Sequence, residues 1–263
     1  MLSNLDWSIR KAAEFKMMSV LGARVDAINY SRTIEIIQDW STRQQSRYVC
    51  IANVHMLMEA IDSSKYRQIL NSADLVTPDG MPLVWMMRAK GKKHQERVYG
   101  PTLMLKTIES AARENIPVGF YGGAPEVLES LIHRMQARYE GLKVAFSCSP
   151  PFRAMSQQED NTIVEQINQS GARILFVGLG CPKQEYWMAN HRGKVNAVMM
   201  GVGAAFDFHS GVKPQAPTWL QKIGLEWLFR LFVEPQRLWR RYLYHNPRFI
   251  VLAIADLLGL IKN

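Results

Sequence analysis

Short apolar runs rich in β-branched and aromatic residues alternate with longer, helically patterned stretches from about residue 19 to residue 205. We predict strands at 48–52, 74–77, 117–121, 143–147, 174–177 and 197–200. In the stretches between them, such as 101–113 and 125–139, apolar residues recur every three or four positions, as in amphipathic helices. This alternation predicts a Rossmann-like α/β fold, with a mostly parallel sheet and helices on both faces.

The pattern changes over the last forty residues. Residues 224–263 mix Trp, Phe and Leu with Arg, and Pro235 and Pro247 each stand where a helix could begin, because proline fits the first helical turn. We predict two or three amphipathic helices here, and we divide the chain into a catalytic domain, 1–222, and a C-terminal helical appendage, 223–263. The apolar stretch 249–261 is shorter than the roughly 20 residues that cross a bilayer, so we expect it to lie on a membrane surface.

Composition narrows the choice of partner and compartment. The 263 residues are 48% hydrophobic, enough for an α/β core, and the net charge of +9 favours an anionic partner such as a nucleotide, a lipid phosphate or a nucleic acid. Three well-separated cysteines, Cys50, Cys148 and Cys181, suit reduced packing residues better than disulfides. Residues 1–15 lack the apolar core of a signal peptide. We therefore expect a cytoplasmic protein.

Polar side chains follow the predicted strands, where ligands bind in parallel sheets. Asp79, in the sequence Pro78-Asp79-Gly80, could accept a proton from an attacking hydroxyl, although an aspartate that caps a turn would look the same. Asn53 and Gln184 carry amides that suit sugar hydroxyls, and capping of a loop is their alternative role.

Glycines follow two other predicted strands, at Gly122-Gly123 and at Gly178 and Gly180. Such positions let a backbone approach a phosphate closely at a helix start. Tight turns of any α/β protein would look similar. Neither segment has the third glycine of the dinucleotide fingerprint, and no Walker lysine pattern occurs, which argues against a dinucleotide oxidoreductase.

The sequence offers no Asp-x-Asp pair for a divalent ion; Asp207-Phe208-His209 is the nearest approach, and we interpret it as structural. A metal-free transferase must neutralise a departing diphosphate with cations or backbone dipoles. Arg237, Arg240 and Arg241 have the spacing of one helix face, with Arg230 and Arg248 flanking them. Together with the neighbouring aromatic residues they favour contact with anionic lipid, and a solvated basic face is the alternative.

Several segments, taken in order, resemble the WecG/TagA/CpsF glycosyltransferase family. The matching segments are ANVHMLMEA (52–60), ADLVTPDGMPLVW (73–85), ERVYGPTLM (96–104), FYGGAPEV (120–127), FVGLGCPKQE (176–185), GVGAAFDFHSG (201–211) and GLEWLFRLFVEPQRLWRRY (224–242). They span most of the chain, and their combination is specific although no single one is.

The resemblance implies an activity and a location. It implies inverting, metal-independent transfer of a hexose-type sugar, such as N-acetylmannosamine or its uronic acid, from a UDP-sugar to a polyprenyl-diphosphate-linked sugar. The products would be exopolysaccharide, teichoic acid or common antigen. We accordingly expect no metal or other cofactor, no nucleic-acid partner, and a peripheral position on the inner face of the cytoplasmic membrane. Self-association as a homo-oligomer is left open. The alternative is a non-catalytic, nucleotide-binding scaffold at the membrane surface.

The resemblance also assigns roles to individual residues. Asp79 matches the family's proposed base, and the other active-site positions are Asn53, Gln184 and Arg97. Three arginines match an appendage that closes over the nucleotide and touches the membrane: Arg230, Arg237 and Arg240. Closure of this kind would complete the diphosphate clamp only at the lipid surface. The glycines Gly122, Gly123, Gly178 and Gly180 would take part in UDP binding.

Two positions depart from the family pattern. Ile51 stands where many members have Thr, and Gln215 stands where many have Arg in an Arg-Ala-Pro run. We expect the reaction class to be unaffected and the identity of the transferred sugar to be left open.

Overall fold

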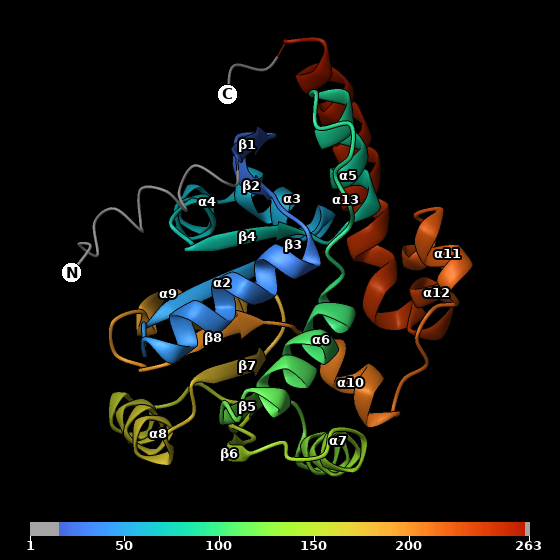
Figure 1. The fold of residues 1–263 in the computed structure, drawn as a ribbon. Coiled ribbons are helices and arrows are strands. Elements are labelled where there is room, and N and C mark those ends of the chain that lie inside the picture. Colours follow the sequence, from blue (N-terminus) through green and yellow to red (C-terminus); the bar gives the residue numbers. More distant parts are fainter. Residues whose placement is uncertain (1–15, 261–263) are drawn as a thin grey trace, which may run out of the picture.

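The computed structural model describes residues 16–260 and places six strands in one sheet (Figure 1). The strands are β3 (Arg47–Ala52), β4 (Leu75–Pro78), β5 (Val118–Gly122), β6 (Val144–Cys148), β7 (Ile174–Gly178) and β8 (Val198–Gly201). Their order is β4-β3-β8-β7-β5-β6, and every neighbouring pair is parallel. Each strand begins and ends within one residue of its prediction, so the predicted α/β fold is confirmed. The prediction about a signal peptide concerns residues 1–15, which lie outside the described residues.

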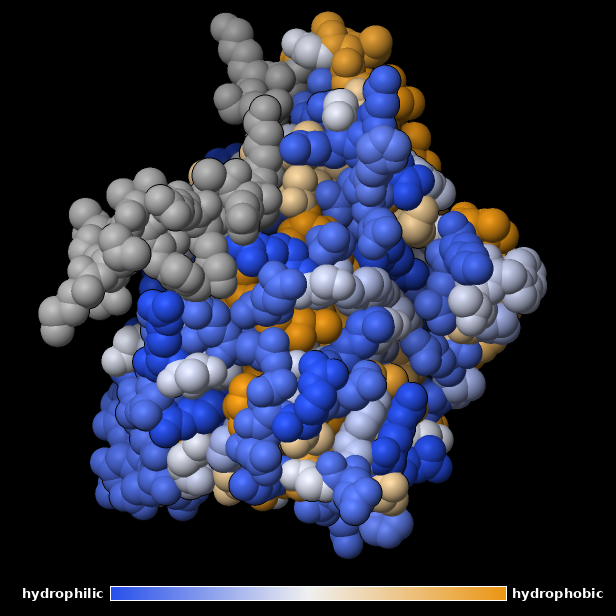
Figure 2. Space-filling model, in the orientation of Figure 1, coloured by the Kyte–Doolittle hydropathy of each residue, from blue (hydrophilic) through white to orange (hydrophobic). Residues whose placement is uncertain are grey.

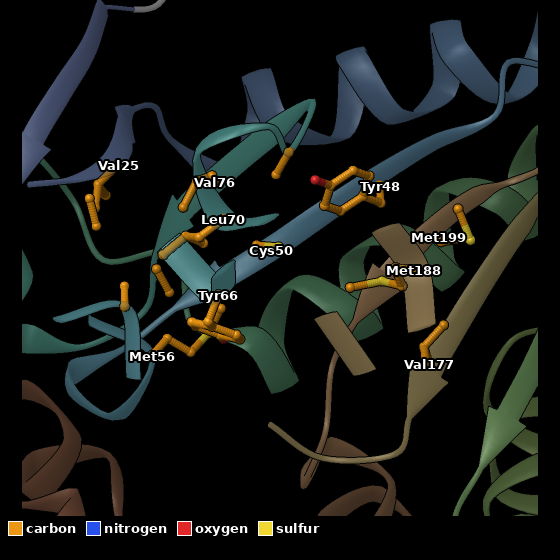
Figure 3. Packing of buried hydrophobic residues seen from close by; sticks show 14 of the residues in the cluster. Val25, Tyr48, Cys50, Met56, Tyr66, Leu70, Val76, Val177, Met188 and Met199 are labelled. Carbon is orange, nitrogen blue, oxygen red and sulfur yellow. The ribbon is translucent and has the colours of Figure 1, made fainter. Parts of the chain in front are cut away.

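Both faces of the sheet are buried, as the unbroken apolar runs require. In β3, Tyr48, Cys50 and Ala52 belong to one core cluster, and Val49 and Ile51 to the other, because successive side chains point to opposite faces. Figure 3 shows part of the first cluster around Cys50. Among its helices are α3 (Val54–Asp62), α4 (Ser64–Asn71), α8 (Gln157–Ser170) and α9 (Lys183–His191). The helices of the second cluster are α2 (Tyr30–Thr42), α6 (Gly100–Arg113), α7 (Pro125–Arg138) and α10 (Ala205–Ser210).

An antiparallel hairpin, β1 (Lys16–Val20) and β2 (Ala23–Ala27), was not expected from the sequence and packs beside β4. The carboxylate of Asp26 is fully buried there and accepts hydrogen bonds from the side chain of Arg24 and, at 2.8 Å, from the backbone N–H of Val76. Since β4 is an edge strand, this bond satisfies a backbone donor that no neighbouring strand reaches. Burial nevertheless raises the pKa of Asp26.

The C-terminal part forms α11 (Thr218–Lys222), α12 (Glu226–Val233) and α13 (Pro235–Leu257). Amphipathic helices were expected here, but the prediction that Pro247 begins one is wrong, because Pro247 lies inside α13. A proline inside a helix removes one backbone hydrogen bond. Packing of the helix on both sides of Pro247 offsets that loss. Leu238 is buried before the proline, and Phe249 and Ala253 are buried after it.

Helix α13 is attached along one face and exposed along the other. Figure 1 shows it running beside α5 (Met81–Ala89), and the two helices are in contact. At the far end, the buried carboxylate of Asp256 accepts from Lys90 Nζ at 2.6 Å and from the backbone N–H of Leu21 at 3.2 Å. The stretch expected to lie on a membrane surface is therefore partly docked on the core. Across residues 16–260, no helix combines the length and apolar character needed to span a bilayer.

We expect Asp256→Ala to lower the free energy of unfolding by about 3 kcal/mol, because it leaves the Lys90 ammonium without its buried partner. Urea denaturation measures this. The matched control is Asp62→Ala, which removes the exposed ion pair between α3 and Arg248 of α13 and should cost less than about 1 kcal/mol. Equal losses in the two variants would show that Asp256 does not anchor the helix.

Candidate active site

Two of the expected polar residues lie side by side at the carboxyl edge of the sheet. Ala52 and Pro78 are register partners in β3 and β4, so Asn53 and Asp79 emerge from adjacent strand ends, and the N–H of Asp79 donates to the carbonyl of Ala52 at 2.8 Å. Both line a cavity of about 590 Å³ whose other walls are α5, α12 and α13. Asn53 also caps α3, its Oδ1 accepting from the N–H of Met56 at 3.2 Å. Capping of α3 is therefore compatible with a position in the cavity wall, where Asn53 was expected to meet a sugar hydroxyl.

Arg97 joins two carboxylates in this cavity. One guanidinium nitrogen, Nη2, donates to Asp79 Oδ1 at 3.1 Å and to Glu226 Oε2 at 2.6 Å, while Nε donates to the backbone carbonyl of Asp79. The three side chains are only 13 to 16% exposed. Arg97 therefore fixes Asp79 by both its backbone and its side chain and connects it to the start of α12.

Tyr99 and Gln215 extend this network. The Tyr99 hydroxyl donates to Glu226 Oε1 at 3.0 Å and accepts from Gln215 Nε2 at 3.1 Å, and the Arg97 guanidinium lies 4.0 Å from the centre of the Tyr99 ring. Gln215, one of the two departures from the family pattern, thus supports Glu226 through Tyr99. The other, Ile51, is buried in the core beside Gly100.

The electrostatics of Asp79 suit a proton acceptor. Burial raises its pKa to about 6, and the negative charge of Glu226 adds to this, whereas Arg97 and Arg230 act in the opposite direction. Arg97 donates to Oδ1 only, and Oδ2 has no hydrogen-bond partner among the described residues. A carboxylate with a pKa near neutrality and one free oxygen facing a cavity can take a proton from a bound hydroxyl.

The cations of the appendage fall into two groups. Arg230 and Arg241 line the cavity, and among residues 16–260 neither forms an ion pair with a carboxylate. Arg230 lies over the ring of Phe208, and the buried Nε of Arg241 has no hydrogen-bond partner in the part of the chain described. The second group, Arg237 and Arg240, is exposed and lies outside the cavity lining. Arg237 pairs with Glu234, and Arg240 lies beside Trp239.

This arrangement corrects the prediction that Arg237, Arg240 and Arg241 share one helix face. The buried positions of α13, such as Leu238 and Phe249, fix which side of the helix turns inward. Arg241 lies on that side, whereas the other two arginines do not.

Three further cavity-side groups could hold a cation. Ligand atoms of His55, Glu59 and His245 all lie within 4.8 Å of one another, and His55 Nε2 is 3.2 Å from Glu59 Oε1. Burial, together with Arg241 and His245, lowers the pKa of His55 to about 3, so the imidazole is neutral. The positive charge of Arg241 beside this group opposes a divalent ion, so the geometry alone does not make it a metal site.

The glycines expected to bind phosphate lie farther along the same edge. Gly122 and Gly178 are register partners, and a Cβ on Gly122 would lie 2.6 Å from the Gly178 backbone. A Cβ on Gly178 would meet the Phe206 ring at 2.6 Å, so close packing requires both glycines. Gly180 has open space around it. With β3 and β8 between β4 and β7, Gly178 lies roughly 14 Å along the edge from Asp79.

A second hollow, of about 470 Å³, lies between α7 and the end of β6. It is lined by residues of α7 and by Ser149, whose hydroxyl donates to the carbonyl of Gly123 at 2.6 Å. Neither Gly122 nor Gly123 is part of its lining.

Gln184 does not reach the cavity. It is 5% exposed, its Nε2 donates to Glu185 Oε1 at 2.7 Å, and it lies against Gly201 at the end of β8. Its buried Oε1 has no partner among the described residues. In this conformation Gln184 supports the strand end beside the site.

Two residues of the site were not selected from the sequence: Tyr99 and Glu226. Tyr99 stands two positions after Arg97, and Glu226 lies in the segment GLEW that already carried the resemblance. Their roles depend on contacts across more than 120 residues of chain, which spacing does not reveal.

Comparison with known proteins identifies the family of this chain. A profile described as "Glycosyl transferase WecG/TagA/CpsF family" matches residues 18–263. The chain belongs to this family. Two similar proteins carry the same name, N-acetylglucosaminyldiphosphoundecaprenol N-acetyl-beta-D-mannosaminyltransferase. The one from Bacillus spizizenii strain W23 is 30% identical over 213 residues, which cover 81% of this chain and 80% of the relative. The one from Bacillus subtilis strain 168 is 28% identical over 209 residues, or 79% of each chain.

As a WecG/TagA/CpsF family member, the chain is a glycosyltransferase, and the family prediction is confirmed. The segments that carried the resemblance supply Asn53, Asp79, Arg97, Glu226 and Arg230 to one cavity.

We expect Glu226→Gln to lower the pKa of Asp79 below its value of about 6, because the variant removes a neighbouring negative charge. A carboxyl ¹³C NMR titration of the free enzyme measures this. Glu234→Gln is the control, since Glu234 pairs with Lys213 and Arg237 and should leave the Asp79 titration unchanged. An unmoved Asp79 titration in Glu226→Gln would contradict the coupling.

Proposed function

We propose that this glycosyltransferase moves a hexose-type sugar from a UDP-sugar to a polyprenyl-diphosphate-linked sugar in cell-surface polysaccharide synthesis, with inversion and without a metal. The observation that carries the proposal is the Asp79 carboxylate, which faces the cavity beside Arg97 and two arginines that have no carboxylate partner among the described residues. The names of the relatives support it, since both describe transfer of N-acetylmannosamine to a diphosphoundecaprenol-linked N-acetylglucosamine.

In this mechanism Asp79 acts as the general base. Its free Oδ2 takes the proton of the acceptor hydroxyl as the hydroxyl oxygen bonds to the anomeric carbon of the donor. The bond between that carbon and the UDP oxygen breaks at the same time, and UDP leaves with its electron pair. Arg97 holds Oδ1 and the Asp79 backbone, which aims Oδ2 into the cavity.

A single displacement fits the carboxylates of this cavity better than a covalent intermediate. Both oxygens of Glu226 already accept hydrogen bonds, from Arg97 and from Tyr99. A carboxylate held in this way is poorly placed to attack an anomeric carbon. With Asp79 as the base and no second carboxylate free of such bonds among the described residues of the lining, we expect inversion at that carbon.

Arginine takes the part that a metal ion plays in other transferases. Arg230 lines the same cavity as Asp79, and its positive charge acts to lower the pKa of that carboxyl. A guanidinium there can neutralise the charge that develops on the departing diphosphate. The nucleotide then extends along the strand ends toward Gly180 and the Gly122-Gly123 turn.

The outer surface of the appendage supports a peripheral position on the inner face of the cytoplasmic membrane. Figure 2 shows hydrophobic residues along the outer edge of α13. Trp219, Phe232, Leu243 and Val251 are each more than 60% exposed, and Arg237 and Arg240 lie on the same outward surfaces. Basic and apolar residues side by side favour an anionic lipid surface. In this proposal Arg237 and Arg240 contact lipid, not the nucleotide.

We expect Asp79→Asn to fold and to bind UDP but to turn over about 100-fold more slowly, because the amide cannot take the proton. For the wild-type enzyme, kcat/KM should fall as the pH drops through about 6, since protonation of Asp79 removes the base. Both are measured with a polyprenyl-diphosphate glycoside acceptor. Wild-type rates in Asp79→Asn would exclude Asp79 as the base.

A non-catalytic scaffold is the competing proposal. It would bind UDP-sugar without releasing UDP. Acceptor-dependent UDP release separates the two, because only a transferase shows it.

We further expect turnover to survive EDTA, whereas Arg230→Gln should lower kcat/KM about 100-fold by removing the charge beside the leaving group. Arg240→Gln is the matched control in a vesicle-free assay, because Arg240 lies outside the cavity lining. The metal-free mechanism would be refuted if EDTA abolished activity and a divalent ion restored it. His55, Glu59 and His245 would then be the candidate ligands.

A further inference from the structure

The cavity continues well beyond the residues that the proposed chemistry uses. From Asp79 it extends between α5 and α13, and its lining changes from charged to apolar along the way. Helix α5 begins two residues after Asp79, so its first turn lies at the proposed base. The 17 residues from Arg241 to Leu257 span roughly 24 Å of α13.

The middle of this path carries positive charge without a counter-ion. Arg241 lines the cavity, and its buried Nε has no hydrogen-bond partner among the described residues. The rings of His55 and His245 lie beside it, each with a buried Nδ1 that has no partner in the described part of the chain. A buried guanidinium without a carboxylate is costly unless an anion binds there.

The far part of the path is an apolar groove. Helix α5 supplies one wall and α13 the other, and the residues are Trp85, Ala89, Phe249, Ile250, Ile254 and Leu257. Four of them remain more than 40% exposed: Trp85, Ile250, Ile254 and Leu257. Lys90, directly after α5, and Asp256 of α13 form an ion pair, so the two walls are held together without an occupant.

We infer that this groove is the binding site for the lipid part of the acceptor, with Arg241 holding the diphosphate and the α5–α13 groove holding the first isoprenoid units. The inference rests on the proposed transfer function and specifies how its acceptor binds. The sequence of charged and apolar walls matches a ligand with a sugar, a diphosphate and a hydrocarbon chain in that order. It also orients the sugar hydroxyl toward Asp79.

A membrane surface alone does not account for these residues. Phe249 is 5% exposed and lies inside the cavity, where a flat bilayer cannot reach it. Val251 and Leu258, on the same helix, are 66% and 68% exposed and lie outside the cavity lining. The outer face of α13 therefore suits the bilayer, and the inner face suits one chain drawn from it.

The test compares binding of farnesyl diphosphate and inorganic pyrophosphate by calorimetry, with UDP present to fill the donor site and without vesicles. The wild-type protein should bind farnesyl diphosphate at least about tenfold more tightly than pyrophosphate, because only the former has a chain to bury. Ile254→Ser should weaken farnesyl diphosphate about tenfold and leave pyrophosphate unchanged. Arg241→Gln should weaken both ligands.

Val251→Ser is the matched control, because it makes the same kind of change on the outer face of the same helix. Both residues are more than half exposed, so both variants should fold. Equal effects of Ile254→Ser and Val251→Ser, or equal wild-type affinities for the two ligands, would overturn the inference. Binding is measured without turnover, so the two proposals can fail separately. If the protein binds farnesyl diphosphate more tightly than pyrophosphate but transfers no sugar, the proposed function is refuted and the assignment of the groove as a lipid site stands.

Discussion

The interaction on which the site depends is the bridge that Arg97 forms between Asp79 and Glu226. The two carboxylates come from the end of β4 and the start of α12, and in a cavity of low polarity their charges repel. A single guanidinium bonded to both makes their proximity possible. Because Glu226 belongs to the C-terminal helices, this bridge also connects the proposed base to the appendage, and movement of the appendage changes the charge around Asp79.

The cavity itself is a joint product of the sheet and these helices. Asn53 and Asp79 come from strand ends and Arg97 from the loop before α6, whereas the segment after residue 222 supplies Glu226, Arg230, Arg241 and the α13 side of the apolar wall. Gly224 lets the turn before α12 approach Trp85, since a Cβ there would lie 2.7 Å from that ring. The segment that carries the exposed hydrophobic surface is thus the one that completes the site, which would couple catalysis to the lipid surface.

Most of the sheet and half of the site could be predicted from the sequence. Strands buried on both faces give apolar runs with clear ends, and in a parallel sheet those ends identify Asn53 and Asp79. The β1–β2 hairpin was missed because it is short and half polar. Periodicity identified α13 but not which of its sides faces inward. That side is set by the docking of Leu238 and Phe249, and it brings Arg241, not Arg240, into the cavity. Partners distant in sequence, such as Arg97 and Glu226, leave no local signal.

The distribution of charge in the cavity indicates how two diphosphates can be accommodated at once. Arg97 is already neutralised by two carboxylates, so it positions groups and has little capacity for a further anion. Arg230 and Arg241 have no such partner among the described residues, and they come from different helices, α12 and α13. In the proposed mechanism, Arg230 on α12 would bind the departing nucleotide and Arg241 on α13 would bind the lipid diphosphate. A transferase whose donor and acceptor are both diphosphates needs this separation, because a single shared cation would make the two substrates compete.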